Sequence, residues 1–188
     1  MAQSKTPLET LTDEQRSVVD FLIRGDHVYV GGPGGSGKSH LIGVILAEFP
    51  MIARRYRGTA PPRIAVTALT GCAAQLLGHG SKTVHSWAGI GLGRGTVDEL
   101  YAKIKKNRRA MKHWLGTDLL IIDEVSMLSA SLFELLNALG KKIRNNDRFF
   151  GGIQLLLVAD FYQLPCISRD EPSRFPFESP AWHEAAFY

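Results

Sequence analysis

Cysteine is scarce in this sequence, and no segment has the pattern of a membrane span or an export signal. The two cysteines, Cys72 and Cys166, lie far apart and in no metal-ligand spacing, so we expect reduced thiols in an intracellular protein. No apolar run is long enough to span a bilayer, and the N-terminus lacks the apolar core of a signal peptide. We therefore predict an intracellular protein without a membrane partner. Separately, we expect a monomer, located in the nucleus or mitochondrion if the source is eukaryotic.

An excess of charge of one sign is also missing. The chain has 22 Lys and Arg against 18 Asp and Glu, and a formal net charge of +4 says little about partners by itself. A hydrophobic fraction of 45% over 188 residues is enough for a core and excludes a disordered chain. This length predicts one domain, or one domain with a small appendage.

A glycine-rich stretch organises the rest of the chain. It reads Gly32-Pro33-Gly34-Gly35-Ser36-Gly37-Lys38-Ser39 and fits the P-loop pattern G-x-x-x-x-G-K-[ST]. The glycines allow backbone N–H groups to point inward around phosphates, Lys38 can reach the outer phosphates, and the Ser39 hydroxyl can ligate Mg²⁺. A glycine-rich turn with a chance lysine is the alternative. The predicted strand before the stretch and the helix after it favour nucleotide binding.

Alternating apolar strands and amphipathic helices predict the fold class. Strands are indicated by continuous apolar runs at 28–30, 64–66, 119–122 and 155–159. Helical patterns cover 12–22, 41–49, 73–77, 97–112 and 129–143. This alternation predicts an α/β fold with a mostly parallel sheet and helices on both faces. Because ligands of such sheets bind beyond the carboxyl ends of the strands, the polar groups that follow the strands should line one edge.

Two carboxylates and an amide follow predicted strands at that edge. Asp123 stands where P-loop NTPases hold Mg²⁺, and Glu124 is then free to orient or deprotonate the attacking water. The alternative is an acidic pair that only stabilises a helix N-terminus. Gln163 follows the strand that ends near Asp160. Its uncharged amide can bond a γ-phosphate and respond to its loss, or can be a polar turn residue before a proline.

Gln15 has two interpretations that the sequence leaves open. Thr12 and Gln15 have the spacing of a capping box, in which the Gln15 side chain bonds back to the Thr12 N–H. A glutamine amide also donates and accepts hydrogen bonds together, which suits an adenine edge. The position just upstream of the P-loop strand makes the second role as plausible as the first.

Two later loops carry small polar groups that suit a nucleic-acid backbone. These groups are Thr67, Thr70, Thr83, His85 and Ser86. The neighbouring Trp87 either stacks on a base or belongs to the core. The basic run from Lys103 to Lys112 is either a solvated helix face or a phosphate-binding surface, and spacing alone does not decide.

Together the motifs resemble a known family. They occur in the order Leu11-Thr12-Asp13-Glu14-Gln15, the P-loop, Thr67-Ala68-Leu69-Thr70-Gly71-Cys72-Ala73-Ala74, Thr83-Val84-His85-Ser86-Trp87-Ala88-Gly89-Ile90-Gly91, Ile122-Asp123-Glu124-Val125-Ser126-Met127 and Asp160-Phe161-Tyr162-Gln163-Leu164-Pro165. This set is similar to the petite-integration-frequency (PIF) family of superfamily 1 DNA helicases. Phe150-Gly151-Gly152-Ile153-Gln154 resembles that family's own signature. The resemblance covers nearly the whole chain.

The resemblance implies an ATP-driven motor that moves 5′ to 3′ on single-stranded DNA and unwinds duplexes, with ATP and Mg²⁺ as cofactors. The implied nucleotide roles are Gln15 for adenine, Lys38 and Ser39 for phosphate and Mg²⁺, Asp123 for Mg²⁺, Glu124 as general base and Gln163 as γ-phosphate sensor. The loops at 67–74, including Gly71, and at 83–87 would hold the DNA strand. Pro165 begins a segment that matches the family's small wedge near the duplex junction.

The resemblance also divides the chain. Residues 1–10 are expected to be an N-terminal tail and 11–164 the first RecA-like ATPase domain. Residues 165–188 would be a short wedge-like segment and the lead-in to a second RecA-like domain, which the chain lacks, so we expect a motor fragment with weak activity. Two departures, Ala159 for an expected glycine and Cys166 for a common proline, touch no catalytic match. The rivals are another P-loop enzyme, such as a small-molecule kinase, and a binding module without useful turnover.

Overall fold

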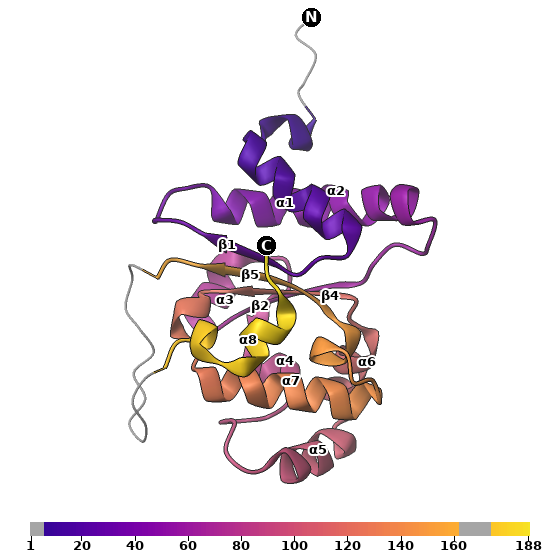
Figure 1. The fold of residues 1–188 in the computed structure, drawn as a ribbon, viewed down its shortest axis with the longest axis vertical. Coiled ribbons are helices and arrows are strands. Elements are labelled where there is room, and N and C mark those ends of the chain that lie inside the picture. The colour runs from indigo at the N-terminus through magenta and orange to yellow at the C-terminus, as the bar shows by residue number, and fades with distance from the viewer. Residues whose placement is uncertain (1–5, 162–173) are drawn as a thin grey trace, which may run out of the picture.

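Five parallel strands form the centre of the protein in a computed structural model, which describes residues 6–161 and 174–188 (Figure 1). The strands are β1 (Val28–Gly31), β2 (Ile64–Ala68), β3 (Lys82–Thr83), β4 (Leu119–Asp123) and β5 (Gln154–Ala159). Their order in the sheet is β1-β5-β4-β2-β3, and each neighbouring pair is parallel. The expected α/β class with a parallel sheet is therefore confirmed.

Helices fill the connections between the strands. The α-helices are α1 (Asp13–Arg24), α2 (Lys38–Arg57), α3 (Gly71–Leu77), α4 (Val84–Ala88), α5 (Val97–Lys106), α6 (Arg108–Gly116), α7 (Ala130–Arg144) and α8 (Pro180–Ala185). Short 3-10 helices are η1 (Pro7–Thr10), η2 (Val125–Met127), η3 (Phe149–Gly152) and η4 (Pro176–Glu178). None of the described helices is both long and apolar enough to cross a membrane.

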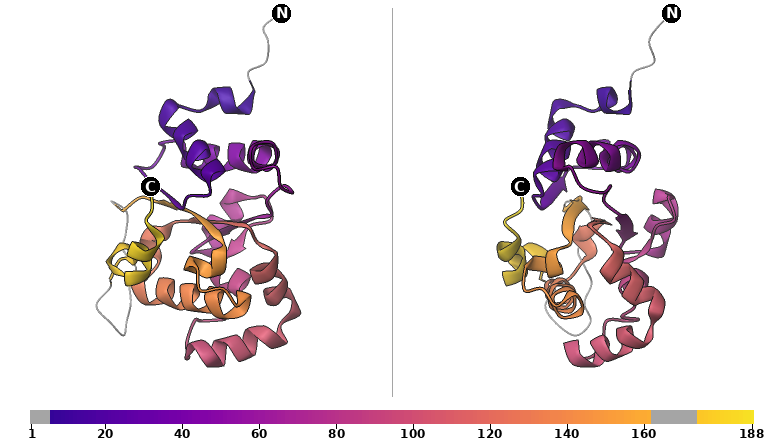
Figure 2. Two further views of the ribbon diagram at one scale, coloured as in Figure 1. Left: turned by 45° about the vertical axis from the view of Figure 1, so that its right-hand side comes forward. Right: turned by 90° about the vertical axis from the view of Figure 1, so that its right-hand side faces the viewer.

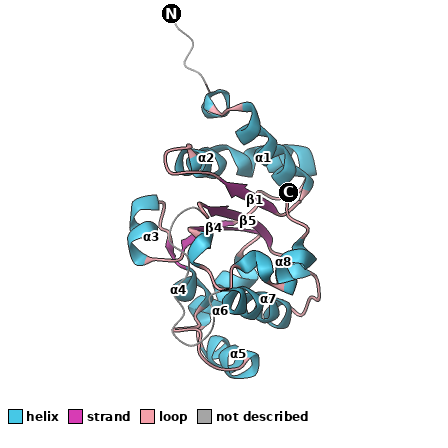
Figure 3. Ribbon diagram, turned by 60° about the vertical axis from the view of Figure 1, so that its left-hand side comes forward, coloured by secondary structure: helices cyan, strands magenta, loops and turns pink. Residues whose placement is uncertain are grey.

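The sheet is covered on both faces, which explains its continuous apolar strands. Alternate residues of β4 belong to different cores: Leu119 and Ile121 pack with α1 and α2, whereas Leu120 and Ile122 pack with α4, α6 and α7. Figure 2 and Figure 3 show α1 and α2 on one side of the strands and α7 on the other. Each face of the sheet therefore has its own packed core.

Helix α2 is longer than the sequence indicates. It continues through Pro50 to Arg57, although a proline inside a helix removes one backbone hydrogen bond and costs about 3 kcal/mol. A buried stripe with a spacing of four residues, Leu41, Ile45, Phe49 and Ala53, runs past the proline. Burial of this stripe on both sides of Pro50 offsets the lost bond, so the arginines after it are helical rather than in a loop.

The predicted helix over 97–112 is two helices. The backbone of Asn107 is extended (φ −98°, ψ 94°), which ends α5, and its Oδ1 accepts hydrogen bonds from the N–H groups of Arg109 and Ala110 at 3.1 and 3.2 Å. Asn107 is therefore an N-cap. The basic residues on either side of it do not share one straight helix face.

Both ends of the described chain pack onto the domain. The expected tail includes a short helix, η1, whose Thr10 hydroxyl lies 2.8 Å from Nε2 of His40. At the other end, the Tyr188 carbonyl accepts from the Tyr29 N–H at 2.9 Å, beside β1. Residues 7–10 of the expected tail thus form a short turn whose Leu8 packs against the core beneath α1 and α2, whereas 174–188 join the core on the other face through Trp182 and Phe187.

Helix α7 and the turn η3 approach each other backbone to backbone. A Cβ atom at Gly140 would lie 2.9 Å from the carbonyl carbon and oxygen of Phe150, and Gly151 has φ +65°. Arg144 Nε donates to the Gly151 carbonyl at 2.7 Å, and Oδ1 of the buried Asn137 accepts from the Phe150 N–H at 2.8 Å. The glycine pair is a packing requirement that keeps α7 against the sheet.

Candidate nucleotide and nucleic-acid site

The P-loop occupies the turn between β1 and α2 and ends at a left-handed glycine. Gly37 has φ +84° and is the N-cap of α2, so a residue with a Cβ would be strained there. Lys38 is the first residue of the helix. Its Nζ donates to the carbonyls of Gly32 and Pro33 at 2.6 and 2.8 Å. The Lys38 ammonium group is therefore held over the loop. In this position phosphate oxygens would replace the two carbonyls as its hydrogen-bond acceptors.

Asp123 and Glu124 follow β4 at the same edge. The register places Ala68 beside Asp123 and Gly31 beside Ala159, so the strands end together. Asp123 Oδ1 accepts from the Glu124 N–H at 2.9 Å, and Glu124 itself is left-handed (φ +59°, ψ +37°). Burial raises the pKa of Asp123, and the charge of Glu124 raises it further, while the Glu124 N–H and Lys38 oppose the shift.

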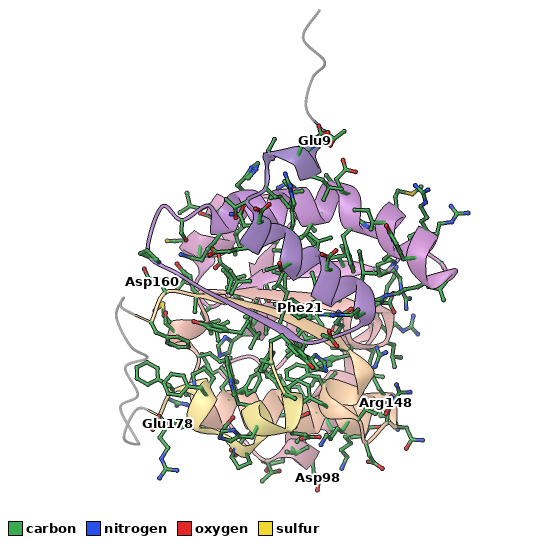
Figure 4. All side chains as sticks on the ribbon, turned by 45° about the horizontal axis from the view of Figure 1, so that its top comes forward. Glu9, Phe21, Asp98, Arg148, Asp160 and Glu178 are labelled. Carbon is green, nitrogen blue, oxygen red and sulfur yellow. The ribbon has the colours of Figure 1, made fainter. Side chains whose placement is uncertain are left out.

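These groups converge on one cavity of about 370 Å³. Its walls include Gly34, Gly35, Gly37, Lys38, Ser39, His40, Asp123, Glu124, Ser126, Ala159 and Asp160. Asp160 lies at the end of β5, beside the turn that follows β1 (Figure 4), and the Gly32 N–H donates to the Ala159 carbonyl at 3.2 Å. The cavity therefore brings together one ammonium, a hydroxyl and carboxylates from the ends of two strands.

The donor set of this cavity fits Mg²⁺ better than a transition metal. Among the described residues there is no group of three or more His, Cys, Asp and Glu that would form an all-protein cage. Mg²⁺ keeps waters and uses one or two carboxylates together with substrate phosphates. Ser39 and Asp123 supply such a partial set, which needs a phosphate to complete it.

The capping box predicted for Gln15 is confirmed. The Thr12 N–H donates to Gln15 Oε1 at 3.1 Å, and the Gln15 N–H donates to Thr12 Oγ1 at 3.2 Å. The other end of the same amide, Nε2, lies 3.5 Å from the carbonyls of Ser36 and Gly37. Gln15 lines a second cavity of about 300 Å³ beside the P-loop. The cap and a position next to the nucleotide are thus compatible.

The loop residues expected to hold DNA fall into two groups. Thr70 and His85 line a cavity of about 630 Å³ adjoining α7, Gly71 and Ser86 are exposed, and the half-buried Thr83 caps α4 by accepting from the Ser86 N–H at 3.1 Å. Thr67 differs. It is fully buried, and its hydroxyl donates to the Ile121 carbonyl at 2.9 Å inside the sheet. The expectation that Thr67 contacts DNA is corrected, because its hydroxyl is used by β4.

Trp87 lies in the core. Its side chain is only 2% exposed, with its ring 4.6 Å from that of Trp114. Its carbonyl lies 2.9 Å from Nδ1 of His113. Within the described chain, Trp87 Nε1 has no hydrogen-bond partner. The structure therefore favours the core interpretation and corrects the alternative of an exposed base-stacking ring. Gln163 and Pro165 lie outside the described residues.

The comparison with known sequences adds a family to this geometry. A family model described as PIF1-like helicase matches residues 10–187. The chain belongs to the PIF1-like helicase family. This confirms the resemblance stated from the motifs.

The relatives of this PIF1-like chain are longer proteins. It is 41% identical over 176 residues to the ATP-dependent DNA helicase PIF1 of Saccharomyces cerevisiae, covering 93% of this chain and 20% of the relative. It also resembles the crystal structure of Pif1 helicase from Candida albicans, with a TM-score of 0.80 and 42% identity over 93% of this chain and 38% of that one. A structure of Bacteroides Pif1 bound to single-stranded DNA gives a TM-score of 0.70 and 25% identity over 95% and 40% of the two chains. The chain thus spans about a fifth of its curated yeast relative.

Some features of the PIF1-like site were not expected from the sequence. His40 and Ser126 line the cavity of about 370 Å³, which we call the nucleotide cavity. The position of His40 directly after the P-loop serine could have indicated this from the sequence. A hydrogen bond of 3.0 Å from Thr70 Oγ1 to Glu124 Oε2 joins a DNA-loop candidate to the expected general base. Their separation of 54 residues hides this pair from any spacing argument.

The PIF1-like chain has a larger cavity elsewhere, which we call the basic cavity. It measures about 780 Å³ and lies along β2 beside α6, because β3 pairs only with Thr67 and Ala68 and leaves 64–66 without a strand on that side. Its basic and histidine walls are Arg63, His79, Lys82, Arg108, Arg109, Lys112 and His113. Among the described residues that line it, none is Asp or Glu. The basic run of the sequence thus partly faces a concave surface.

Proposed function

We propose that this chain is the ATP-binding motor domain of a 5′-to-3′ DNA helicase that couples ATP hydrolysis to movement on single-stranded DNA and to duplex unwinding. The observation that carries the proposal is the convergence of Lys38, Asp123 and Glu124 on one cavity at the carboxyl edge of the sheet. The yeast relative is named an ATP-dependent DNA helicase, and a Bacteroides neighbour is described with single-stranded DNA. Both support this assignment for the longer protein.

The residues of the cavity divide the reaction between them. Lys38 leaves the carbonyls of Gly32 and Pro33 and neutralises phosphate charge. Ser39 and Asp123 would hold Mg²⁺, which would supply positive charge to stabilise the negative charge that develops on the phosphate oxygens. Glu124 accepts the proton of the attacking water. Gln15, beside the P-loop, would read adenine, and Gln163 would sense the γ-phosphate.

The proposed motor needs more than this domain. A second RecA-like domain would close on ATP, supply an arginine worth a factor of about 10³–10⁵ in phosphoryl transfer, and complete the DNA track. The wedge at Pro165, a monomeric state, a nuclear or mitochondrial location, and roles in DNA repair, recombination and telomere maintenance belong to the same proposal. The 188-residue chain alone should therefore bind nucleotide, hydrolyse it weakly and unwind nothing.

The test compares ATPase rates of the full-length protein with and without single-stranded DNA. Strong stimulation is expected for a helicase and not for a small-molecule kinase. Glu124→Gln should retain nucleotide binding and lose about 10²–10⁴ in turnover, because an amide cannot take the proton. Asp123→Asn should instead weaken the Mg²⁺-dependent binding. Full turnover by Glu124→Gln would exclude its role as general base, and robust unwinding by the chain that ends at Tyr188 would exclude the need for a second domain.

A further inference from the structure

Thr70 stands between two cavities. It lines the cavity of about 630 Å³ together with His85, and its hydroxyl reaches across to Glu124, which lines the nucleotide cavity. The donor is Thr70 Oγ1 and the acceptor is Glu124 Oε2, 3.0 Å apart and partly buried. A single hydrogen bond thus connects the proposed DNA loop with the proposed general base.

The hydroxyl of Thr70 has no spare donor. It accepts from the Ala73 N–H at 3.1 Å as the N-cap of α3, and it donates to Glu124. A threonine hydroxyl carries one proton and can therefore donate only one strong hydrogen bond at a time. A phosphate oxygen that takes this proton must take it from Glu124.

Hydrogen bonds hold the backbone of Glu124 in place, so only its side chain can move when DNA binds. The residue is left-handed, its N–H donates to Asp123 Oδ1, and its carbonyl accepts from the Met127 N–H at 3.0 Å. A general base must lie within hydrogen-bond reach of the water that it activates. While Oε2 is bound to Thr70, the orientation of the carboxylate is set by the DNA loop and not by the water.

We infer that Thr70 is a positioning residue that withholds Glu124 from catalysis until a DNA phosphate takes its hydroxyl proton. This inference rests on the proposed function and adds a regulation to it. With DNA in place Glu124 Oε2 is released from Thr70 and can accept from water in the nucleotide cavity that the residue already lines, and without DNA it remains bound to Thr70. Stimulation of hydrolysis by DNA then requires no large movement within this domain.

The test replaces the hydroxyl with a methyl group in the full-length protein. Thr70→Val should raise kcat without DNA by at least about 10-fold, since a hydrogen bond to a charged group shifts an equilibrium by about that factor or more. KM for ATP should not change. The ratio of kcat at saturating single-stranded oligonucleotide to kcat without it should fall by the same factor, and Thr70→Ser should restore the parent behaviour.

A matched control is available in the same domain. Thr96 caps α5 by accepting from the Glu99 N–H at 3.3 Å and donates to Glu99 Oε2 at 3.1 Å, but it lies away from the nucleotide cavity. Thr96→Val removes the same two interactions, and it should leave kcat with and without DNA at the parent values. The melting temperatures of all variants measure the loss of stability caused by a missing helix cap, and so separate it from the change in kcat caused by the missing hydrogen bond to Glu124.

The outcomes are distinct. If the parent protein is stimulated by DNA but Thr70→Val has the parent's basal kcat, or if its rates with and without DNA fall equally, the inference is wrong while the proposed function stands. If the parent protein is not stimulated at all, the proposed function itself fails, and the gate fails with it.

Discussion

The basic cavity is larger than the nucleotide cavity, but the nucleotide cavity is lined by charged groups of both signs. The nucleotide cavity is about half as large, 370 against 780 Å³, yet it combines Lys38 with the carboxylates of Asp123 and Glu124. The basic cavity has cations and no lining carboxylate among the described residues. The nucleotide cavity can pair an ammonium group with phosphate and offers carboxylate oxygens to Mg²⁺ and to the proton of a water molecule, whereas the lining of the basic cavity offers no carboxylate. The chemistry of the lining, and not the volume, is the reason to propose the nucleotide cavity as the reaction site.

The most direct test of this comparison is Lys38→Ala, which should abolish the ability of the nucleotide cavity to hold phosphate. Removal of the ammonium leaves phosphate charge in the nucleotide cavity without its main counter-charge, so affinity for Mg-ATP should fall at least about 10-fold. Titration calorimetry measures it on the 188-residue chain, with the exposed Lys105→Ala on α5 as a charge-matched control. Undiminished affinity in Lys38→Ala would remove the distinction between the two cavities.

Trp87 also lines the basic cavity, and Trp87→Ala tests whether this part of the wall is core or binding surface. Removal of this buried ring should reduce the free energy of unfolding by about 3–5 kcal/mol. A chain of this size falls by roughly 2–4 °C in melting temperature per kcal/mol. Trp87→Phe should cost much less, since Nε1 has no partner among the described residues. A DNA-binding defect of Trp87→Ala with an unchanged melting temperature would instead restore the base-stacking role.

The cations of α6 give a smaller effect, which is a weaker affinity for DNA together with a weaker dependence of that affinity on salt. We expect Arg108→Ala and Lys112→Ala to leave nucleotide affinity unchanged. Removal of one cation that pairs with a phosphate should flatten the slope of log affinity for single-stranded DNA against log salt by about 0.7. Fluorescence anisotropy over a salt series in the full-length protein measures this slope. A slope that does not change in either variant would identify α6 as a solvated face.

The smallest effect concerns the ion pair at the rim of the basic cavity. Asp118 accepts from Nε and the backbone N–H of Arg63 at 3.0 and 2.8 Å. Partial burial opposes ionisation of Asp118, but the hydrogen bonds and charge of Arg63 lower its pKa below the ordinary value. The pair therefore stabilises the fold above the unfolded-state pKa, and the gain is lost as the pH falls through the lower folded-state pKa.

Asp118→Asn should accordingly cost at most about 1 kcal/mol at neutral pH, because the pair is partly exposed and screened by solvent. The difference from the parent chain should shrink as the solution is acidified through the titration of Asp118. Urea unfolding at several pH values measures it. A difference that stays constant down to low pH would show that packing, and not charge, is responsible.

The sequence predicts the nucleotide cavity well because its parts are local. A strand, a glycine turn and a helix begin and end within 28–57, and Asp123 follows an unmistakable apolar run. The hydrogen bond between Thr70 and Glu124 depends instead on β2 lying next to β4, a strand order that no spacing in the sequence contains. The roles of Gln163 and Pro165 remain predictions.

The predictions of two helix boundaries were wrong, for opposite reasons. At Pro50 the local rule predicted an end, but the buried stripe through Phe49 and Ala53 outweighed it. At Asn107 the basic residues suggested continuity, although an asparagine before a new helical turn is a recognised N-cap that could have been read. Tertiary burial decided the first case, and an overlooked local signal the second.

The close approach of Gly140 to the turn at Gly151 limits which substitutions this sequence can accept during evolution. Since the two backbones touch, no trimming of a neighbouring side chain can make room for a Cβ at Gly140, and a substitution there has to be answered by moving a whole turn. In a mutational scan scored only by growth, Gly140 would rank beside Lys38 although it takes no part in the chemistry. Abundance would separate them: variants at Gly140 should vanish from the soluble fraction, while variants at Lys38 persist as inactive protein.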